Sequence, residues 1–249
     1  MKKAAKSPAK SSLKFRRILL KLSGEVLRSP DGAECISPAV LDQMVASIRE
    51  ARDLGAQIGI VIGGGNIFRG LRSGDRGIPR TDGDNMGMLA TMINSLALEA
   101  ALLAHGIPAQ ALSARAMPAF AELFSARRAR ELLSQGTVVI MGGGSGAPFF
   151  STDSAAALRA AEIGADLLLK ATKVDGIYSD DPVKNPAATR FDAISFADVL
   201  AKRLKVMDST AFALCQDNDI PVLVFDFFKK GELLKALRGR KAGTLVSNR

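Results

Sequence analysis

The stretch that decides the fold is Thr137–Ser154, TVVIMGGGSGAPFFSTDS. It opens with an apolar, largely β-branched run, which is typical of a strand buried on both faces. A glycine-rich loop follows, where backbone can approach a ligand closely because glycine has no Cβ. N-cap residues and an alanine-rich segment closed by Gly164 then predict a helix that begins near Asp153. A strand, a glycine loop and a helix N-terminus in series favour an anion site, which we interpret as a phosphate site.

A tight turn followed by a capped helix would give the same pattern, because a glycine loop alone is a weak motif. A second copy of the arrangement supports the phosphate interpretation. The predicted strand Gln57–Ile62 runs directly into three glycines, and Arg69 follows at a predicted helix start. The first predicted strand, Ile18–Leu22, carries a single charge on Lys21. A lysine in an apolar strand is unfavourable unless its amine is paired or faces a ligand.

Helical and extended patterns alternate along the rest of the chain. We expect helices at Ser37–Gly55, from Asp84 past Leu103, around Pro118–Leu133, from Asp153 to Ile163, at Ser195–Leu204 and at Thr210–Asp217. We expect further strands at Asp166–Leu169 and Pro221–Phe225, with Thr244–Val246 as an edge strand. This alternation predicts an α/β fold with one mainly parallel sheet covered by helices on both faces. The long helix is too apolar for a surface helix, so we expect core burial, with an oligomer interface as the alternative.

The net charge of +9 comes mostly from one end of the chain. Residues 1–17 contain seven basic side chains and no acidic one, so the remainder is nearly neutral. We therefore predict a basic, disordered tail at 1–13 and a single domain at 14–249, and we do not expect nucleic acid as a partner. A transit peptide is the alternative for the tail. Two cysteines do not make a disulfide framework, which favours a cytoplasmic protein. No apolar run approaches 20 residues, so we expect no membrane span.

Several common site chemistries are excluded. Gly65 and Gly70 have P-loop spacing, but Leu71-Arg72 stand where Lys and Ser or Thr are required. Gly142, Gly144 and Ala147 match the dinucleotide-binding pattern, but Pro148 follows and the helix begins too late to pack as that motif needs, so a Rossmann dehydrogenase is a weaker alternative. A single histidine, His105 at a predicted helix end, disfavours zinc catalysis and histidine-based triads.

The remaining chemistry is phosphoryl transfer, which needs backbone amides for phosphates and cations for the developing charge. The two glycine loops supply the amides, while Lys21 and Arg69 supply cations. Together the motifs KLSGE, VIGGGNIFRG, DNMGMLAT, APFFSTDSAA, LLKATKVDGIY, DDP, KVMD and GTLV resemble bacterial-type uridylate (UMP) kinases of the amino acid kinase family. The match runs in register from about Lys14 to Val246. It implies a three-layer αβα sandwich, transfer of the ATP γ-phosphoryl group to UMP, a homohexamer, and Mg²⁺ carried by ATP with no metal ligand from the protein.

The resemblance also implies particular contacts. ATP would be held by Lys21, Leu22, Ser23, Gly24, Gly65, Arg69, Thr172, Tyr178 and Asp181. UMP would be held by Gly64, Asp84, Ser145, Gly146, Ala147, Pro148, Phe149, Phe150, Ser151 and Thr152. Ala147, Ser145 and Asn85 depart from the residues that are common in the family. GTP and UTP are possible effectors, although the loop Pro30–Cys35, Glu99 and Leu103 depart from the expected form.

The catalytic residues implied are Lys21, Asp153 and Arg69. The acceptor phosphate is largely ionised at neutral pH, so no general base is needed. Asp153 is expected to orient a lysine or metal-bound water, or else only to cap its helix. Two alternatives remain open, namely a sister kinase that phosphorylates a carboxylate or carbamate, and a nucleic-acid-binding protein that uses the basic tail.

Overall fold

The computed structural model describes residues 13–68, 77–182, 184–202, 204 and 206–248. The predicted tail therefore lies almost entirely outside the described residues, and so does Arg69. The described part forms one nine-stranded sheet in the order β4-β3-β5-β2-β1-β6-β8-β9-β7. The strands are β1 (Arg17–Leu22), β2 (Gln57–Ile62), β3 (Ala109–Ser113), β4 (Glu122–Leu123), β5 (Val138–Gly142), β6 (Leu167–Thr172), β7 (Ala193–Ser195), β8 (Val222–Asp226) and β9 (Thr244–Ser247).

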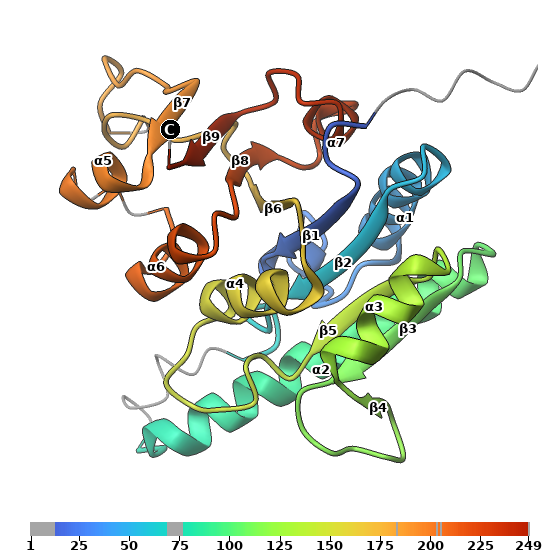
Figure 1. Ribbon diagram of the computed structural model, residues 1–249. Coiled ribbons are helices and arrows are strands. Elements are labelled where there is room, and N and C mark those ends of the chain that lie inside the picture. Colours follow the sequence, from blue (N-terminus) through green and yellow to red (C-terminus); the bar gives the residue numbers. More distant parts are fainter. Residues whose placement is uncertain (1–12, 69–76, 183, 203, 205, 249) are drawn as a thin grey trace, which may run out of the picture.

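Helices cover both faces of this sheet, as Figure 1 shows, and give the predicted three-layer α/β fold. They are the short 3-10 helix η1 (Gly24–Leu27) and the α-helices α1 (Pro38–Asp53), α2 (Arg80–Ala104), α3 (Ala126–Ser134), α4 (Thr152–Ile163), α5 (Phe196–Ala201), α6 (Ser209–Asp217) and α7 (Glu232–Leu237). All strand pairs are parallel except β8 with β9. The prediction of a mainly parallel sheet is confirmed.

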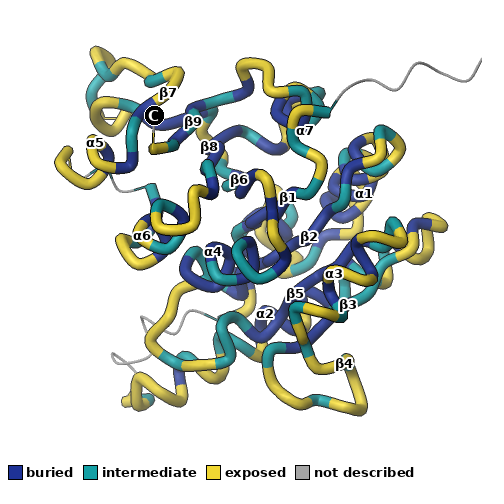
Figure 2. The backbone as a smooth tube through the Cα atoms, viewed as in Figure 1, coloured by how far each residue is buried: buried dark blue, intermediate teal, exposed yellow. Residues whose placement is uncertain are grey.

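The sheet separates two apolar clusters because successive side chains of a strand point to opposite faces. In β1, Ile18, Leu20 and Leu22 pack with η1, α1, α7 and the C-terminal half of α2. Leu19 packs on the other face with α3, α4 and α6. The central strands are accordingly buried along most of their length, which Figure 2 shows as the dark interior of the sheet. Such all-apolar strands are expected where both faces are covered.

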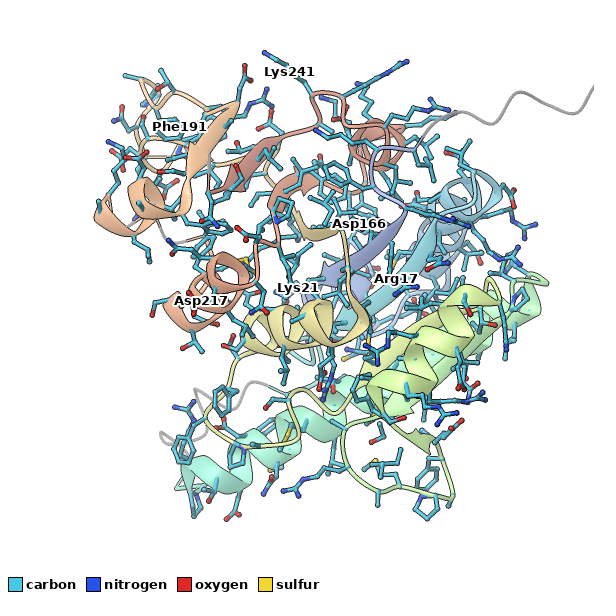
Figure 3. The ribbon with its side chains drawn as sticks, viewed as in Figure 1. Arg17, Lys21, Asp166, Phe191, Asp217 and Lys241 are labelled. Carbon is cyan, nitrogen blue, oxygen red and sulfur yellow. The ribbon has the colours of Figure 1, made fainter. Side chains whose placement is uncertain are left out.

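Side chains at the amino end of β1 fix its place in the sheet. The carboxylate of Asp166 accepts hydrogen bonds from the backbone N–H groups of Arg16 and Arg17, each at 2.8 Å. The Arg17 guanidinium in turn donates to the last carbonyl of α4, on Ile163, at 2.6 Å. Figure 3 labels Arg17 and Asp166 at this end and Lys21 at the other. These contacts fix the amino end of β1, and Lys21 lies near its other end, next to the last residue of the strand.

Several details differ from the sequence expectations. The long helix begins at Arg80, so Asp84 lies inside it and is not its cap, which is Pro79. Only Ala126–Ser134 of the expected helix at 118–133 is helical, because a turn and the short strand β4 precede it. The strands β3 and β7 and the helix α7 have no counterpart in the prediction. The last strand, β9, lies inside the sheet between β8 and β7 and is not an edge strand.

Helix α2 is only partly buried, which corrects the expectation of core burial. One face packs against the sheet, but Met86, Leu89, Ile93 and Leu103 are exposed on the other. By length and composition α2 could cross a bilayer, whereas the sequence predicted no membrane span. The core helix of a soluble protein can have the same length and apolar composition. His105 follows as its C-cap, and its ring contacts the carbonyl of Ala101 at 2.8 Å, in agreement with the predicted role at a helix end.

Candidate active site

The site is built at the carboxyl edge of the parallel strands, where loops that follow different strands meet. Lys21 is the penultimate residue of β1, and Gly63–Gly65 follow β2. The second glycine loop follows β5, which pairs directly with β2. Thr152 begins α4 immediately after that loop, and its Oγ1 lies close to Gly63. The two predicted glycine motifs are thus neighbours in space.

A cavity of about 640 Å³ opens between the two loops and the start of α2, and we call it the glycine-loop cavity. Gly65, predicted to contact ATP, is among its lining residues. Eight of the ten residues predicted to hold UMP also line it: Gly64, Asp84, Ser145, Ala147, Phe149, Phe150, Ser151 and Thr152. Gly146 and Pro148 belong to the same loop. The structure therefore brings the predicted acceptor residues together around one space.

A second cavity of about 580 Å³, the Tyr178 cavity, lies beyond the end of β6. It is lined by three residues predicted to hold ATP, namely Thr172, Tyr178 and Asp181, together with two lysines, Lys184 and Lys202. The Tyr178 hydroxyl donates to Asp175 at 2.7 Å, which fixes the ring at the cavity wall. This hydrogen bond is the first cause of a lowered Asp175 pKa and of a raised Tyr178 pKa.

A buried cluster of two lysines and one aspartate lies between the two cavities. Lys21 on β1 and Lys170 on β6 are partners in the register of neighbouring parallel strands. Asp153, in the first turn of α4, contacts both: Lys21 Nζ is 2.6 Å from Oδ1, and Lys170 Nζ is 2.6 Å from Oδ2. Figure 3 shows Lys21 next to α4. Lys170 Nζ also donates to the carbonyl of Val206, which lines the Tyr178 cavity.

The cluster carries one net positive charge. Burial raises the pKa of Asp153, but the charges of Lys21 and Lys170 outweigh this effect and hold the pKa below its ordinary value. Burial also lowers the pKa of Lys170, and although the Asp153 carboxylate opposes this, the pKa remains lower than for a free lysine. Asp153 Oδ1 has no well-aligned hydrogen bond in the described part of the chain, so the ion pair with Lys21 is its main stabilising contact. An uncompensated buried cation attracts an anionic group.

Asp153 is positioned by its helix but does not cap it. The N-cap is Ser151, whose hydroxyl accepts from the N–H groups of Asp153 at 3.0 Å and Ser154 at 3.1 Å. Asp208, the N-cap of α6, accepts hydrogen bonds from the hydroxyls of both serines. The alternative that Asp153 only caps its helix is therefore wrong. The carboxylate is free to hold the two lysines.

Asp84 connects α2 to the second glycine loop. Its Oδ2 atom accepts a hydrogen bond from Arg80 Nε and another from the N–H of Phe149, each at 2.8 Å. Phe149 has a left-handed backbone (φ 72°), which is unusual for a residue other than glycine. Its ring is 63% exposed and lies under the Arg80 guanidinium at 5.5 Å. Both bonds use Oδ2, and Asp84 is among the residues that line the glycine-loop cavity.

The remaining predicted residues lie near the end of β1. The Ser23 hydroxyl caps η1 by accepting from Glu25 N at 3.4 Å, and Leu22 is fully buried. A Cβ on Gly24 would lie 2.4 Å from Gly63 O, so only glycine lets these two backbones approach. Arg69, predicted to bind ATP and to act in catalysis, lies outside the described residues.

Sequence reasoning assigned no role to Lys170 or Asp208. A signal for Lys170 was present, because LLLKAT carries a lone lysine in an apolar strand just as ILLKLS does around Lys21. The same reasoning on buried lysines would have selected both. Asp208 closes the KVMD motif, but its role could not be derived locally, since its partners Ser151 and Ser154 are more than fifty residues away.

The fold and this edge define an α/β phosphotransferase without a P-loop. Residues 16–226 match the amino acid kinase family, and the chain belongs to that family. It is 53% identical over 234 residues to the uridylate kinase of Mesorhizobium japonicum, covering 94% of this chain and 97% of that one. It is 51% identical over 235 residues to the uridylate kinase of Parabacteroides distasonis, covering 94% and 99%. The crystal structure of the UMP kinase from Bacillus anthracis is similar, with a TM-score of 0.91, 36% identity, and coverage of 94% and 96%.

Proposed function

We propose that the chain is a UMP kinase, which transfers the γ-phosphoryl group of ATP to UMP and produces UDP and ADP. The observation that carries this proposal is the cationic Lys21–Asp153–Lys170 cluster between two cavities, one of which is lined by both glycine loops. Uridylate kinase relatives that align over 94% of the chain favour UMP over a carboxylate or carbamate acceptor. The tail's positive charge is the only feature that favours nucleic-acid binding.

The two cavities divide the substrates between them. ATP occupies the Tyr178 cavity with its phosphates directed towards the lysine cluster, and Lys184 and Lys202 offer further positive charge there. UMP occupies the glycine-loop cavity, where Asp84 Oδ1 accepts hydrogen bonds from ribose hydroxyls. The exposed rings of Phe149 and Phe150 provide apolar surface on the same side. In this arrangement both phosphate groups meet at Lys21 and Lys170.

The chemistry follows from charge. The UMP phosphate is largely a dianion at neutral pH, so its oxygen can attack without a general base. The main barrier is repulsion between two polyanions, on the order of 4 kcal/mol for a unit-charge pair about 4 Å apart at an effective dielectric near 20. Lys21 and Lys170 offset this repulsion and stabilise the charge that develops on the transferred group. Asp153 keeps both ammonium groups in place. Its lowered pKa makes it a poor base.

Mg²⁺ is proposed to arrive with ATP, held by phosphate oxygens. The Asp153 carboxylate, which lies in the lysine cluster, is already paired with two lysines. In the described ranges no three His, Cys, Asp or Glu side chains gather at one point. Such an ion, carried in with ATP, would supply positive charge that neutralises part of the charge on the phosphates. The protein's own cations, Lys21 and Lys170, act where the two phosphate groups meet.

The exposed apolar face of α2 supports assembly into an oligomer, which we propose is a homohexamer. Leu89 is 49% and Ile93 49% exposed, and Phe120 and Leu123 are exposed on the segment around β4. Water contact with so many large apolar groups is unfavourable, and a second copy of the chain would remove it. We also propose a cytoplasmic location, since Cys35 and Cys215 are both free thiols.

Regulation by GTP or UTP stays a prediction. Glu99, which departs from the expected form, has a local structural role. Its Oε1 accepts a hydrogen bond from the N–H of Ala111 on β3 at 2.8 Å. Adding GTP or UTP to the assay described next would decide whether either nucleotide changes the rate.

The test is ADP formation from ATP and Mg²⁺ with UMP, CMP, carbamate or N-acetylglutamate offered singly. We expect turnover with UMP that exceeds turnover with each of the others by at least about tenfold. Turnover with a carboxylate or carbamate and not with UMP would select the sister activity. The absence of ADP with every acceptor would reject the kinase proposal.

A further inference from the structure

One face of α2 holds both glycine loops. Thr91 and Asn94 are three residues apart and therefore lie on the same side of the helix. Thr91 contacts the loop after β5, and Asn94 contacts the loop after β2. Asn94 is fully buried and Thr91 nearly so. Buried polar side chains in the middle of a helix are unfavourable unless their hydrogen bonds are made.

The Thr91 hydroxyl makes one hydrogen bond as donor and one as acceptor. It donates to the carbonyl of Met88 at 2.7 Å and accepts from the N–H of Gly143 at 2.8 Å. Gly143 has a left-handed backbone (φ 79°), and a Cβ there would lie 3.1 Å from Ala114 N. The loop can adopt this path because glycine allows it, and Thr91 holds its first amide after β5 in one direction.

Asn94 forms a paired amide contact with Asn66, the residue after the first glycine loop. Asn94 Nδ2 donates to Asn66 Oδ1 and to Gly63 O, both at 2.7 Å. Asn66 Nδ2 donates to Asn94 Oδ1 at 3.0 Å and to Cys35 O at 2.8 Å. All four amide hydrogens are used. A network satisfied in this way admits one geometry, because any shift leaves a buried polar group unpaired.

The loops also pack against α2 without space to shift. A Cβ on Gly64 would lie 2.7 Å from Ala90 Cβ and 2.8 Å from Gly87 O, which are both on α2. A Cβ on Gly24 would lie 2.4 Å from Asn66 Oδ1, so the end of β1 joins the same contact. The helix, both loops and the segment after Lys21 therefore form one tightly packed unit.

We propose that Thr91 and Asn94 are positioning residues for phosphoryl transfer, which set the separation and direction of the two glycine loops. This inference rests on the proposed function. Thr91 also lines the glycine-loop cavity, but its hydroxyl is bonded to Met88 and Gly143. Both side chains therefore act through the loops, whose amides and carbonyls they hold. A displacement of about 1 Å between reacting groups is enough to slow a reaction by a factor on the order of 10². A residue that only filled the core would have no such effect on turnover.

The first experiment compares three single variants on one helix. Thr91→Val keeps the side-chain shape but leaves Gly143 N–H without its acceptor, whereas Thr91→Ser keeps the hydroxyl. Ser95→Ala is the matched control, because the buried Ser95 hydroxyl donates only to Thr91 O of the same helix at 2.8 Å. We expect Thr91→Val to lower kcat/KM for UMP about tenfold and to leave the ATP KM nearly unchanged. Thr91→Ser and Ser95→Ala should stay within about twofold of the parent.

The second experiment is amide hydrogen exchange without substrate. Thr91→Val should speed exchange at Gly143, and Asn94→Ala should speed it in residues 63–67, while Ser95→Ala should change neither. A folded Thr91→Val with kcat/KM for UMP within about twofold of the parent would overturn the inference. So would an equal loss in Ser95→Ala, or unchanged exchange in both loops. A parent protein that does not phosphorylate UMP would instead reject the proposed function, and the exchange result would still decide whether α2 holds the loops.

Discussion

Lys21 and Lys170 lie side by side on neighbouring parallel strands, and one carboxylate, that of Asp153, separates their charges. Two buried ammonium groups at adjacent positions of a sheet would repel each other strongly without this carboxylate. The three groups carry one net positive charge at the edge where the glycine loops end, and Asp208 offsets only part of the charge of Lys170. An anionic phosphoryl group bound there would be attracted by this net positive charge.

Lys21→Ala should lower kcat by a factor on the order of 10² or more, because the variant loses a cation that acts on the transition state. The fold should persist, since Lys170 can still pair with Asp153. Steady-state kinetics and circular dichroism would measure the two effects. A folded variant with nearly normal turnover would assign Lys21 a structural role only.

Lys170 should determine the alkaline limit of activity. Burial lowers its pKa below the ordinary value of 10.5, so its charge is lost at a lower pH than that of an exposed lysine. The kcat should therefore fall as pH rises towards 10.5. Lys170→Arg keeps its charge at every pH in this range, and its alkaline limit should move upwards even if its kcat is lower. Ionisation of the uracil ring affects both proteins equally, so coinciding alkaline limits would contradict this role.

Asp153→Asn should destabilise the fold by about 3 kcal/mol at neutral pH, because it leaves two buried lysines without a counter-charge. The pKa of Asp153 lies below 3.8 in the folded protein. The stabilisation is therefore fully present above the unfolded-state value of 3.8 and is lost as pH falls through the folded-state pKa. Urea unfolding of both proteins at several pH values would measure it. The difference between parent and variant should shrink below pH 3.8, and a constant difference would show that charge is not its cause.

Asp84→Asn should raise the UMP KM about tenfold, which corresponds to roughly 1.5 kcal/mol for a charge-assisted hydrogen bond to ribose. Asparagine can still accept from the Phe149 N–H, so the loop should keep its place. The ATP KM should not change. Arg80→Gln is a useful control, because it removes the other partner of Asp84 Oδ2 but no proposed ribose contact. An unaltered UMP KM in Asp84→Asn would remove Asp84 from the acceptor site.

Leu89→Glu with Ile93→Glu should shift the assembly towards smaller species, because both side chains are exposed on one face of α2. Each charge would have to be buried in an interface without a partner. Analytical ultracentrifugation would measure the distribution. A matched pair on α5, Leu200→Glu with its exposed neighbour Ala197→Glu, adds the same charge elsewhere and should leave the distribution unchanged. Identical sedimentation of all three proteins would exclude α2 as the interface.

Much of the fold could be predicted from local patterns. The strands β1 and β2 were placed within one residue, because apolar runs that end in glycine are visible in the sequence. The strand β3 was not, because AQALS is short and half-polar and gains its partners only from β4 and β5. The start of α2 was placed four residues late, since the polar first turn lacks an apolar period.

The candidate site was predicted in its parts but not in its connections. Both glycine loops and Lys21 were found because each has its own local signal. The pairing of Lys21 with Lys170 depends on strand register, and the contact of Asp208 with Ser151 depends on how α6 packs on α4. Such relationships arise only when distant segments meet, so a single sequence does not display them.

The position of β9 has a consequence for the order in which the chain folds during its synthesis. β7 pairs with β9 alone, and β9 is made some fifty residues later. Until Thr244–Ser247 has left the ribosome, β7 and the preceding wall of the Tyr178 cavity have no sheet to join. The Thr244 hydroxyl then accepts a hydrogen bond from Ile177 N at 2.9 Å and donates one to Phe191 O. These two bonds hold the segment from Ile177 to Phe191 against β9. The nascent chain can thus complete its glycine-loop half first, and the Tyr178 cavity is closed last.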